Sequence, residues 1–281
     1  MIYFRQDKLL IKKATLLFDK QTENGGLFMK FSICGMTDMR KYGADFSELN
    51  AAAIYTMSHD EFFALKQKIQ KGDILPYAAN GLVPGSIHLT GPEVNFDTVR
   101  NYAEICFGKL SELGIKILVF GSSAAKIVPE GFSMEKAWEQ LFEVGRIFSD
   151  VAKKYGQTIA VEGLRRAECN IVNTLSDVHY YVEKVNRDNF RMLADFYHIH
   201  ENGEDISDVK KYKGLLVHCH IAGYIKRAVP TAEEADFIKE CITALKEMDY
   251  DGAVSFEGSY DVNDVKSITD MFALFKKCAD L

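Results

Sequence analysis

Four side chains that commonly bind metal ions stand at the ends of four short apolar segments in the second half of the sequence. The segments are QTIAVE, RMLADF, GLLVHCH and GAVSFE, and the side chains are Glu162, Asp195, His220 and Glu257. Three carboxylates a few ångströms apart in a low-dielectric pocket cannot all stay ionised without a cation among them. Oxygen ligands with one imidazole and no thiolate suit one divalent ion, with Mn²⁺ favoured and Co²⁺, Mg²⁺ or Zn²⁺ as alternatives. We therefore expect a metal-dependent enzyme.

The spacing of these side chains predicts how they meet. They are 33, 25 and 37 residues apart, which is about one strand plus one helix each. A (β/α)₈ barrel of ~250 residues allots roughly 31 residues to each unit and builds its active site at the C-terminal ends of its strands. Four ligands at successive strand ends would then converge on one point. The fold class is therefore expected to be α/β, with a single (β/α)₈ TIM barrel.

The alternation of side chains along a strand indicates which of the two histidines in the third segment is the metal ligand. Side chains two positions apart share a face of a strand, so His218 and His220 point the same way and Cys219 points to the opposite side. Because the active site of such a barrel lies at the C-terminal rim, we expect His220 to be the ligand. His218 should lie one layer deeper.

Strand and helix signals alternate along the rest of the chain, as in parallel βαβ units. The strands expected in the first half are Phe31–Gly35, Ala44–Ser47 with its end at Glu48, Ile74–Gly81, and the segment IKILVFGS. Helices are expected to begin at the capping-box patterns S-H-D-E and T-A-E-E, at Thr174, and to cover Phe96–Leu113 and about Ser133–Tyr155.

Residues 1–28 precede the first expected strand. They mix charged and apolar residues and lack the uninterrupted apolar core of a secretory signal. One hypothesis is that translation starts at Met29, so that residues 1–28 are a misassigned start. The alternative is a genuine N-terminal extension packed on the bottom of the barrel. In either case residues 29–281 are expected to form the barrel domain.

Composition and charge exclude several classes of partner. A net charge of -6 gives no basic surface for nucleic acid, and no apolar run approaches the roughly 20 residues needed to span a bilayer. The six cysteines are scattered without a C-x-x-C pair, so we expect reduced thiols and a cytoplasmic protein. The absence of G-x-x-x-x-G-K-[ST] and of G-x-G-x-x-G argues against nucleotide cofactors.

Five segments resemble the xylose-isomerase-like TIM-barrel superfamily of sugar isomerases and epimerases, and within it most closely the ketose 3-epimerases of the D-tagatose/D-psicose type. They are VFGSS-x₅-PEGF, IAVEGLRRAECNIVNT, LADFYHI, HCHIAGYIKRAVP and YDGAVSFEG. The resemblance implies a sugar substrate and is compatible with a homo-oligomer, a dimer or a tetramer. It places the metal ligands at Glu162, Asp195, His220 and Glu257, the acid/base pair at Glu162 and Glu257, and substrate-binding residues at Glu168, His198 and Arg227.

Two segments depart from the pattern of the ketose 3-epimerases. The tripeptide Gly-Leu-Arg at positions 163–165 stands where the family often has Pro-Leu-Asn, and the segment 220–227 is one residue longer. Lys126, Arg165 and Arg166 are expected to add positive charge at the mouth of the barrel. That charge would allow a phosphorylated or carboxylated substrate.

The expected function is a metal-dependent sugar epimerase or isomerase that abstracts a proton next to a carbonyl through an enediolate. A metal-dependent lyase or dehydratase on a keto-sugar, keto-glycoside or inosose would use the same site and is the main alternative. A DNA-repair enzyme of the endonuclease IV type is a further class, and that resemblance implies a His-rich site for three zinc ions. Too few of the seven His lie near strand ends for such a site. A non-catalytic sugar-binding barrel is the remaining class.

Overall fold

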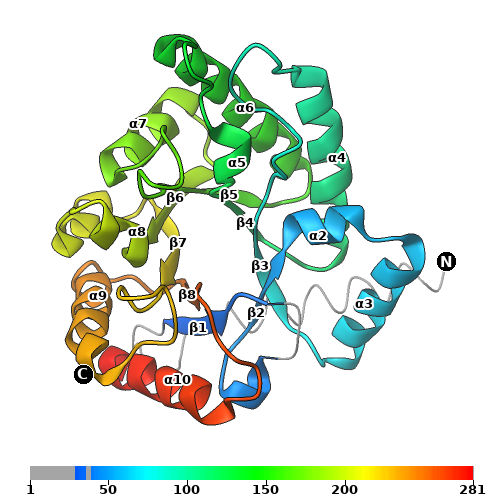
Figure 1. Cartoon of the computed structure of the whole chain (residues 1–281). Coiled ribbons are helices and arrows are strands. Elements are labelled where there is room, and N and C mark those ends of the chain that lie inside the picture. Colours follow the sequence, from blue (N-terminus) through cyan, green and yellow to red (C-terminus); the bar gives the residue numbers. More distant parts are fainter. Residues whose placement is uncertain (1–28, 36–38, 281) are drawn as a thin grey trace.

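Eight parallel strands form a barrel surrounded by helices (Figure 1). The computed structural model describes residues 29–35 and 39–280; the N-terminal extension expected at 1–28, and its alternative start, therefore lie outside the described residues. The strands are β1 (Lys30–Ile33), β2 (Ser47–Asn50), β3 (Pro76–Asn80), β4 (Ile117–Phe120), β5 (Thr158–Glu162), β6 (Phe190–Asp195), β7 (Leu216–Ile221) and β8 (Ala253–Phe256).

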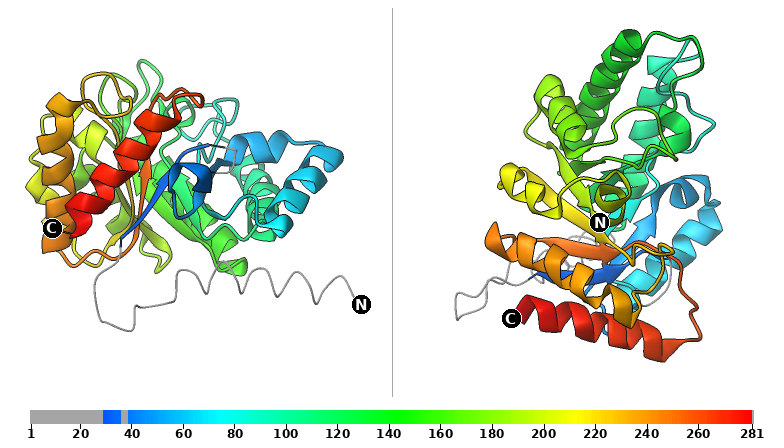
Figure 2. Two further views of the ribbon diagram at one scale, coloured as in Figure 1. Left: turned by 90° about the horizontal axis from the view of Figure 1, so that it is seen from below. Right: turned by 60° about the vertical axis from the view of Figure 1, so that its left-hand side comes forward.

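Helices follow the strands and cover the outside of the barrel. They are α2 (Ala51–Thr56), α3 (His59–Lys71), α4 (Phe96–Glu112), α5 (Ser123–Lys126), α6 (Met134–Lys154), α7 (Leu175–Val185), α8 (Phe196–Glu201), α9 (Ala235–Glu247) and α10 (Val265–Asp280), with 3₁₀ turns η1 (Arg40–Tyr42), η2 (Ile206–Tyr212) and η3 (Ala232–Glu234). The last two helices lie side by side on the outside of the barrel, as both views of Figure 2 show. This alternation confirms the predicted TIM barrel.

The barrel closes where the first two strands meet. The sheet runs β1-β8-β7-β6-β5-β4-β3-β2, and a parallel bridge between Cys34 and Glu48 joins its ends. The hydroxyl of Ser32 donates to the backbone carbonyl of Phe46 at 2.8 Å, which adds a contact across the same seam. The two ends of the sheet are therefore held by one backbone bridge and by side chains.

Capping explains the helix starts. Ser58 and Glu61 form the expected capping box at α3, and Thr231 and Glu234 form the second one. That second box opens the 3₁₀ turn η3, which leads directly into α9. The side chain of Thr174 caps α7. Each box satisfies backbone N–H groups that a helix start leaves without partners.

The second strand differs from the prediction. It was expected at Ala44–Ser47 with its end at Glu48, but β2 begins at Ser47 and continues to Asn50. Asp45 is held outside the strand, because its carboxylate accepts the backbone N–H of Phe31 at 2.8 Å. Glu48 consequently lies within the strand instead of at its end.

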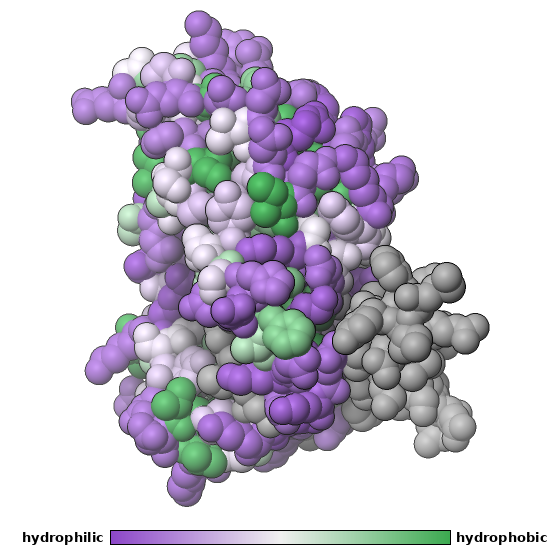
Figure 3. Space-filling view, turned by 90° about the vertical axis from the view of Figure 1, so that its right-hand side faces the viewer, coloured by the Kyte–Doolittle hydropathy of each residue, from purple (hydrophilic) through white to green (hydrophobic). Residues whose placement is uncertain are grey.

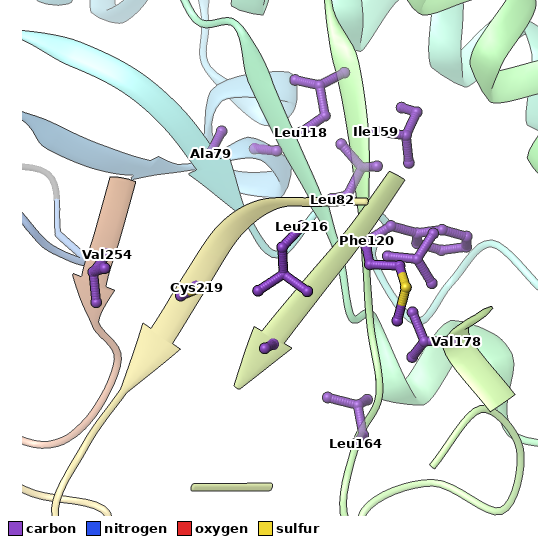
Figure 4. Close-up of a cluster of buried hydrophobic side chains, with 14 of the residues drawn as sticks. Ala79, Leu82, Leu118, Phe120, Ile159, Leu164, Val178, Leu216, Cys219 and Val254 are labelled. Carbon is purple, nitrogen blue, oxygen red and sulfur yellow. The ribbon is translucent and has the colours of Figure 1, made fainter. Parts of the chain in front are cut away.

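Two apolar regions support the strands. The larger lies between the strands and the helices, and Figure 4 shows part of it around Leu118, Ile159 and Phe120. The smaller consists of Phe46, Ala78, Ile117, Val119, Ala160, Leu193 and Ala253. Ala160 and Leu193 share a strand face with Glu162 and Asp195, which are two residues further on. The smaller region is therefore the packed floor beneath the strand ends.

The outer surface is mixed in character. On the face shown in Figure 3, apolar side chains lie in small groups among polar ones. Scattered apolar side chains of this kind are ordinary on a folded protein. No helix within 29–35 and 39–280 is long and apolar enough to cross a membrane. All six cysteines lie in the described part of the chain, and each is a free thiol.

Candidate metal centre

The four side chains at the ends of β5 to β8 meet in the structure. Ligand atoms of Glu162, Asp195, His220 and Glu257 all lie within 4.8 Å of one another. Nδ1 of His220 lies 3.4 Å from Oε1 of Glu162 and 3.3 Å from Oε2 of Glu257. Three carboxylates and one imidazole nitrogen therefore surround one point at the C-terminal rim of the barrel.

The hydrogen bonding of this cluster fits a metal ion. Oε1 of Glu162 and Nδ1 of His220 are both buried without a hydrogen-bond partner, although they lie close to each other. A buried polar atom without a partner is costly and calls for an explanation. A divalent ion bound between these atoms would satisfy both, so the donor set fits an oxygen-rich metal site.

Burial and mutual charge give the cluster unequal proton affinities. Burial and the negative charge of Glu257 raise the pKa of Glu162. Burial alone would also raise the pKa of Glu257, but His220 and Arg227 lower it to about 2. For His220, burial alone would lower the pKa, whereas the carboxylates of Glu48 and Glu257 raise it well above its usual value. The pKa of Glu257 is therefore lower than that of Glu162, so Glu257 is the more readily ionised of the two carboxyl groups.

Arg227 reaches the cluster despite the longer loop that carries it. Its guanidinium Nη2 lies 2.6 Å from Oε2 of Glu257 and 3.4 Å from Oδ2 of Asp195. Its backbone has φ 46°, in the left-handed region, and its carbonyl accepts the N–H of Ser259 at 2.8 Å. A Cβ on Gly258 would lie 2.7 Å from that carbonyl. The glycine therefore allows the close approach that holds Arg227 over the site.

The other two predicted substrate-binding residues differ in depth. His198 is buried, and its Nε2 lies 3.6 Å from Oδ2 of Asp195 and 3.2 Å from Nη2 of Arg227. Glu168 lies further out, because its Oε1 accepts from Nε of Arg165 at 2.7 Å and lies 3.5 Å from Nη1 of Arg227. His198 thus adjoins the cluster, whereas Glu168 supports two arginines at its edge.

The extra positive charge expected at the mouth is largely absent. Lys126 is fully buried, burial lowers its pKa, and its Nζ lies 3.5 Å from the backbone carbonyl of Glu162. Arg165 forms ion pairs with Glu168 and Glu201. Of the three basic residues only Arg166 is exposed. The expectation was wrong for Lys126 because its side chain is buried at the end of α5, and the charge of Arg165 is compensated.

Two residues of the first half contact the cluster and were missed as site residues. Asn80, the last residue of β3, donates from Nδ2 to Oε1 of Glu257 at 2.8 Å. Glu48 in β2 contacts Nε2 of His220 at 2.9 Å. Both residues were placed in or beside expected strands, and the only available signal was a polar residue near a strand end.

One thiol also lies beside the cluster. Sγ of Cys34 falls within 4.8 Å of ligand atoms of His220 and Glu257. Desolvation and the nearby charge of Glu48 raise the pKa of Cys34 well above its usual value. The quartet contains two buried ligand atoms without a hydrogen-bond partner and is therefore the stronger candidate.

A comparison with known families agrees with the fold. The chain belongs to the family of xylose isomerase-like TIM barrels. The match to this family covers residues 36–278 and therefore includes all four residues of the cluster. The predicted resemblance to this family is confirmed.

Relatives within the family are isomerases and epimerases by name. The chain is 27% identical over 265 residues to an inosose isomerase of Halalkalibacterium halodurans, which covers 89% of this chain and 87% of that protein. It is 27% identical over 135 residues to a 3-dehydro-D-guloside 4-epimerase of Escherichia coli, covering 47% of this chain and 51% of that protein. These relatives support an isomerase or epimerase enzyme and give no support to a lyase.

Solved structures share the fold. A D-psicose 3-epimerase from Clostridium cellulolyticum H10, solved with D-tagatose, superposes with a TM-score of 0.75 at 17% identity and covers 89% of this chain and 99% of that one. The IOLI protein, solved with a bound zinc atom, superposes with a TM-score of 0.61 at 21% identity over 89% of this chain and 96% of that one. At these identities the likeness establishes the architecture.

Proposed function

We propose that this protein is a divalent-metal-dependent epimerase or isomerase that acts on a sugar, or on a related cyclic polyol, bearing a ketone. The observation that carries the proposal is the buried cluster of Glu162, Asp195, His220 and Glu257, in which two atoms that face each other have no hydrogen-bond partner. The names of the relatives support the same class of reaction and substrate.

The four cluster residues would hold the ion. A bound divalent ion would polarise the substrate carbonyl and stabilise the negative charge that develops on its oxygen. Mn²⁺ is the proposed ion because the donor set is rich in oxygen, and the zinc in the IOLI structure makes Zn²⁺ the principal competitor.

Glu162 and Glu257 would move the protons. They stand at the ends of β5 and β8, and β6 and β7 lie between these two strands in the sheet. One carboxylate would take the proton from the carbon beside the carbonyl, and the other would return a proton to the opposite face, which inverts the centre. If one carboxylate did both on one face, the proton would pass between neighbouring carbons and the result would be an isomerisation.

The remaining residues would orient the substrate. Arg227 and His198 offer nitrogen atoms beside Glu257 and Asp195, so they can bind substrate oxygens next to the reacting carbon. Glu168 would fix Arg227 from the outer side. The compensated charge of Arg165 and the burial of Lys126 favour an unphosphorylated substrate.

Proton exchange in D₂O tests the proposal directly. The enzyme with Mn²⁺ would be incubated with a panel of ketoses, 3-keto-glycosides and inososes, and NMR would follow which carbon acquires deuterium. Deuterium beside the ketone together with a new epimer or isomer is the expected result. Loss of an aglycone or of water would assign the protein to the lyases instead, and no exchange with any substrate of the panel would contradict the proposed reaction. The cytoplasmic location and the homo-oligomer stay predictions.

A further inference from the structure

The carboxylate of Glu48 lies in the interior of the barrel and contacts two imidazoles of β7. Its Oε2 lies 2.7 Å from Nε2 of His218, and its Oε1 lies 2.9 Å from Nε2 of His220. All three side chains have no exposed surface. One carboxylate thus connects a residue of the metal cluster to a histidine one layer below it.

Apolar side chains also pack around this group. The ring of Phe46 packs edge-on against the imidazole of His218, and the apolar floor of the barrel lies beneath. Glutamate is almost never fully buried unless it is paired, and a buried ion pair is often no more stabilising than apolar side chains of the same volume. Stability therefore gives little reason for a carboxylate here, and its contact with a cluster residue suggests a functional one.

The contact decides which nitrogen of His220 is available to an ion. An ionised carboxylate only accepts hydrogen bonds, so the Nε2 that faces it must carry a hydrogen. Nδ1 is the other nitrogen, and it faces Glu162 and Glu257 without a hydrogen-bond partner. The orientation of the ring and the position of its hydrogen thus both point Nδ1 at the cluster.

We propose that Glu48 is a positioning residue that holds His220 with hydrogen on Nε2 and presents Nδ1 to the bound ion. Metal-binding histidines commonly donate their other N–H to a carboxylate, which fixes the ring and increases its basicity. The inference rests on the metal site of the proposed function, but it needs no particular substrate or reaction.

His218 has a different part in this arrangement. Its Nε2 contacts Oε2 of Glu48, the oxygen that does not face His220. Oγ of Ser255 lies 3.4 Å from the same nitrogen. The second contact fixes the plane of the carboxylate, so that Oε1 stays directed at His220. His218 itself does not reach the carboxylates of Glu162 or Glu257 in any contact found among the described residues. It therefore serves as an anchor for Glu48.

The first test assigns the ring nitrogens in the full-length protein loaded with Zn²⁺, a diamagnetic ion. Two-dimensional ¹⁵N–¹H NMR of histidine-labelled protein should show His220 with hydrogen on Nε2 and with Nδ1 bound to zinc. Coordination through Nε2 of His220 would overturn the proposal. This measurement uses the unaltered chain, so it does not depend on the folding of a variant.

The second test compares three variants by calorimetric titration with Mn²⁺ alone. Glu48→Met removes both acceptor oxygens and should weaken binding about 10- to 100-fold, the range found when such supporting partners are lost. Glu48→Gln keeps one acceptor oxygen in the same shape and should recover part of that loss. The matched control is Glu204→Met, which makes the same change at a partly buried glutamate that accepts the N–H of Leu175, and it should bind Mn²⁺ as the wild type does.

The NMR signal of His220 separates positioning from a general loss of structure. In Zn²⁺-loaded Glu48→Met the Nε2 hydrogen should shift upfield and exchange faster with solvent, because its acceptor is gone. Unchanged Mn²⁺ affinity in Glu48→Met, or equal losses in Glu48→Met and Glu204→Met, would refute the proposal. Normal ion binding without proton exchange on any substrate would refute the proposed reaction alone and leave the role of Glu48 standing.

Discussion

The two halves of the barrel contribute different kinds of residue to the candidate site. Strands β5 to β8 end in the four residues of the cluster, whereas β2 and β3 contribute Glu48 and Asn80, which contact cluster residues. The two supporting residues are also far in sequence from the cluster residues that they contact. Asn80 and Glu257 are 177 positions apart, and Glu48 and His220 are 172 apart. The second half supplies the candidate ligands, and the first half holds them in place from across the barrel.

This difference predicts a ranking of effects. Changes to the ion or to a ligand of the second half should remove activity, and changes to a supporting residue of the first half should reduce it.

Removal of the ion should have the largest effect. Protein purified without chelator should contain close to one equivalent of Mn, Co, Mg or Zn, measured by plasma mass spectrometry. Treatment with EDTA should abolish turnover, because the carbonyl would lose its Lewis acid. Addition of Mn²⁺ or Co²⁺ should restore turnover. A metal-free preparation with full activity would refute the proposed centre.

Loss of one ligand carboxylate should come next. Glu257→Gln removes both a ligand charge and a proton acceptor, so kcat should fall by at least the roughly 10²–10⁴-fold that a general base contributes. Steady-state kinetics at saturating Mn²⁺ would measure it. Glu204→Gln, which alters a partly buried glutamate that accepts the N–H of Leu175, is the matched control and should stay close to wild type.

Loss of a supporting residue in the first half should be milder. Asn80→Ala removes the donor to Oε1 of Glu257 and should lower kcat/KM about 10- to 100-fold. Asn50→Ala is the comparison, because Asn50 also ends a strand of the first half but caps α2. If both variants lose activity equally, the effect comes from the fold and not from the orientation of Glu257.

The smallest effect is expected at Arg227. Arg227→Ala should raise KM roughly tenfold, as expected for the loss of one hydrogen bond to a charged group, and change kcat less. Arg187→Ala, which breaks a surface ion pair with Asp150, should change neither constant. Identical KM values for Arg227→Ala and wild type would show that Arg227 does not bind the substrate.

The second half of the fold was predictable because its signals are local. In Thr158–Glu162 and Phe190–Asp195, each strand has three apolar residues followed by an acidic residue at its end. Parallel strands of a barrel bring such ends to one rim, so the convergence of Glu162 and Asp195 needed no knowledge of side-chain contacts.

The supports could not be predicted in the same way. The partner of Glu48 lies on β7, which is not adjacent to β2 in the sheet, and no spacing rule connects these two strands. The shift of β2 depends on a hydrogen bond from Phe31 to the side chain of Asp45. The burial of Lys126 depends on the contact of α5 with the segment after β3, where the hydroxyl of Thr90 donates to the carbonyl of Lys126 at 3.0 Å. Each of these results from tertiary contacts.

The seam between β1 and β2 links the centre to the folding of the chain. β1 pairs with β8 along Lys30–Ile33, and Cys34 bridges to Glu48, so the barrel closes only after its last strand is in place. Contacts between such distant segments form slowly, because a long loop must be ordered before they stabilise the chain. An ion that binds only the closed barrel shifts the equilibrium toward closure by mass action. Metal supply would then set the fraction of chains whose barrel is open, and so their exposure to proteases.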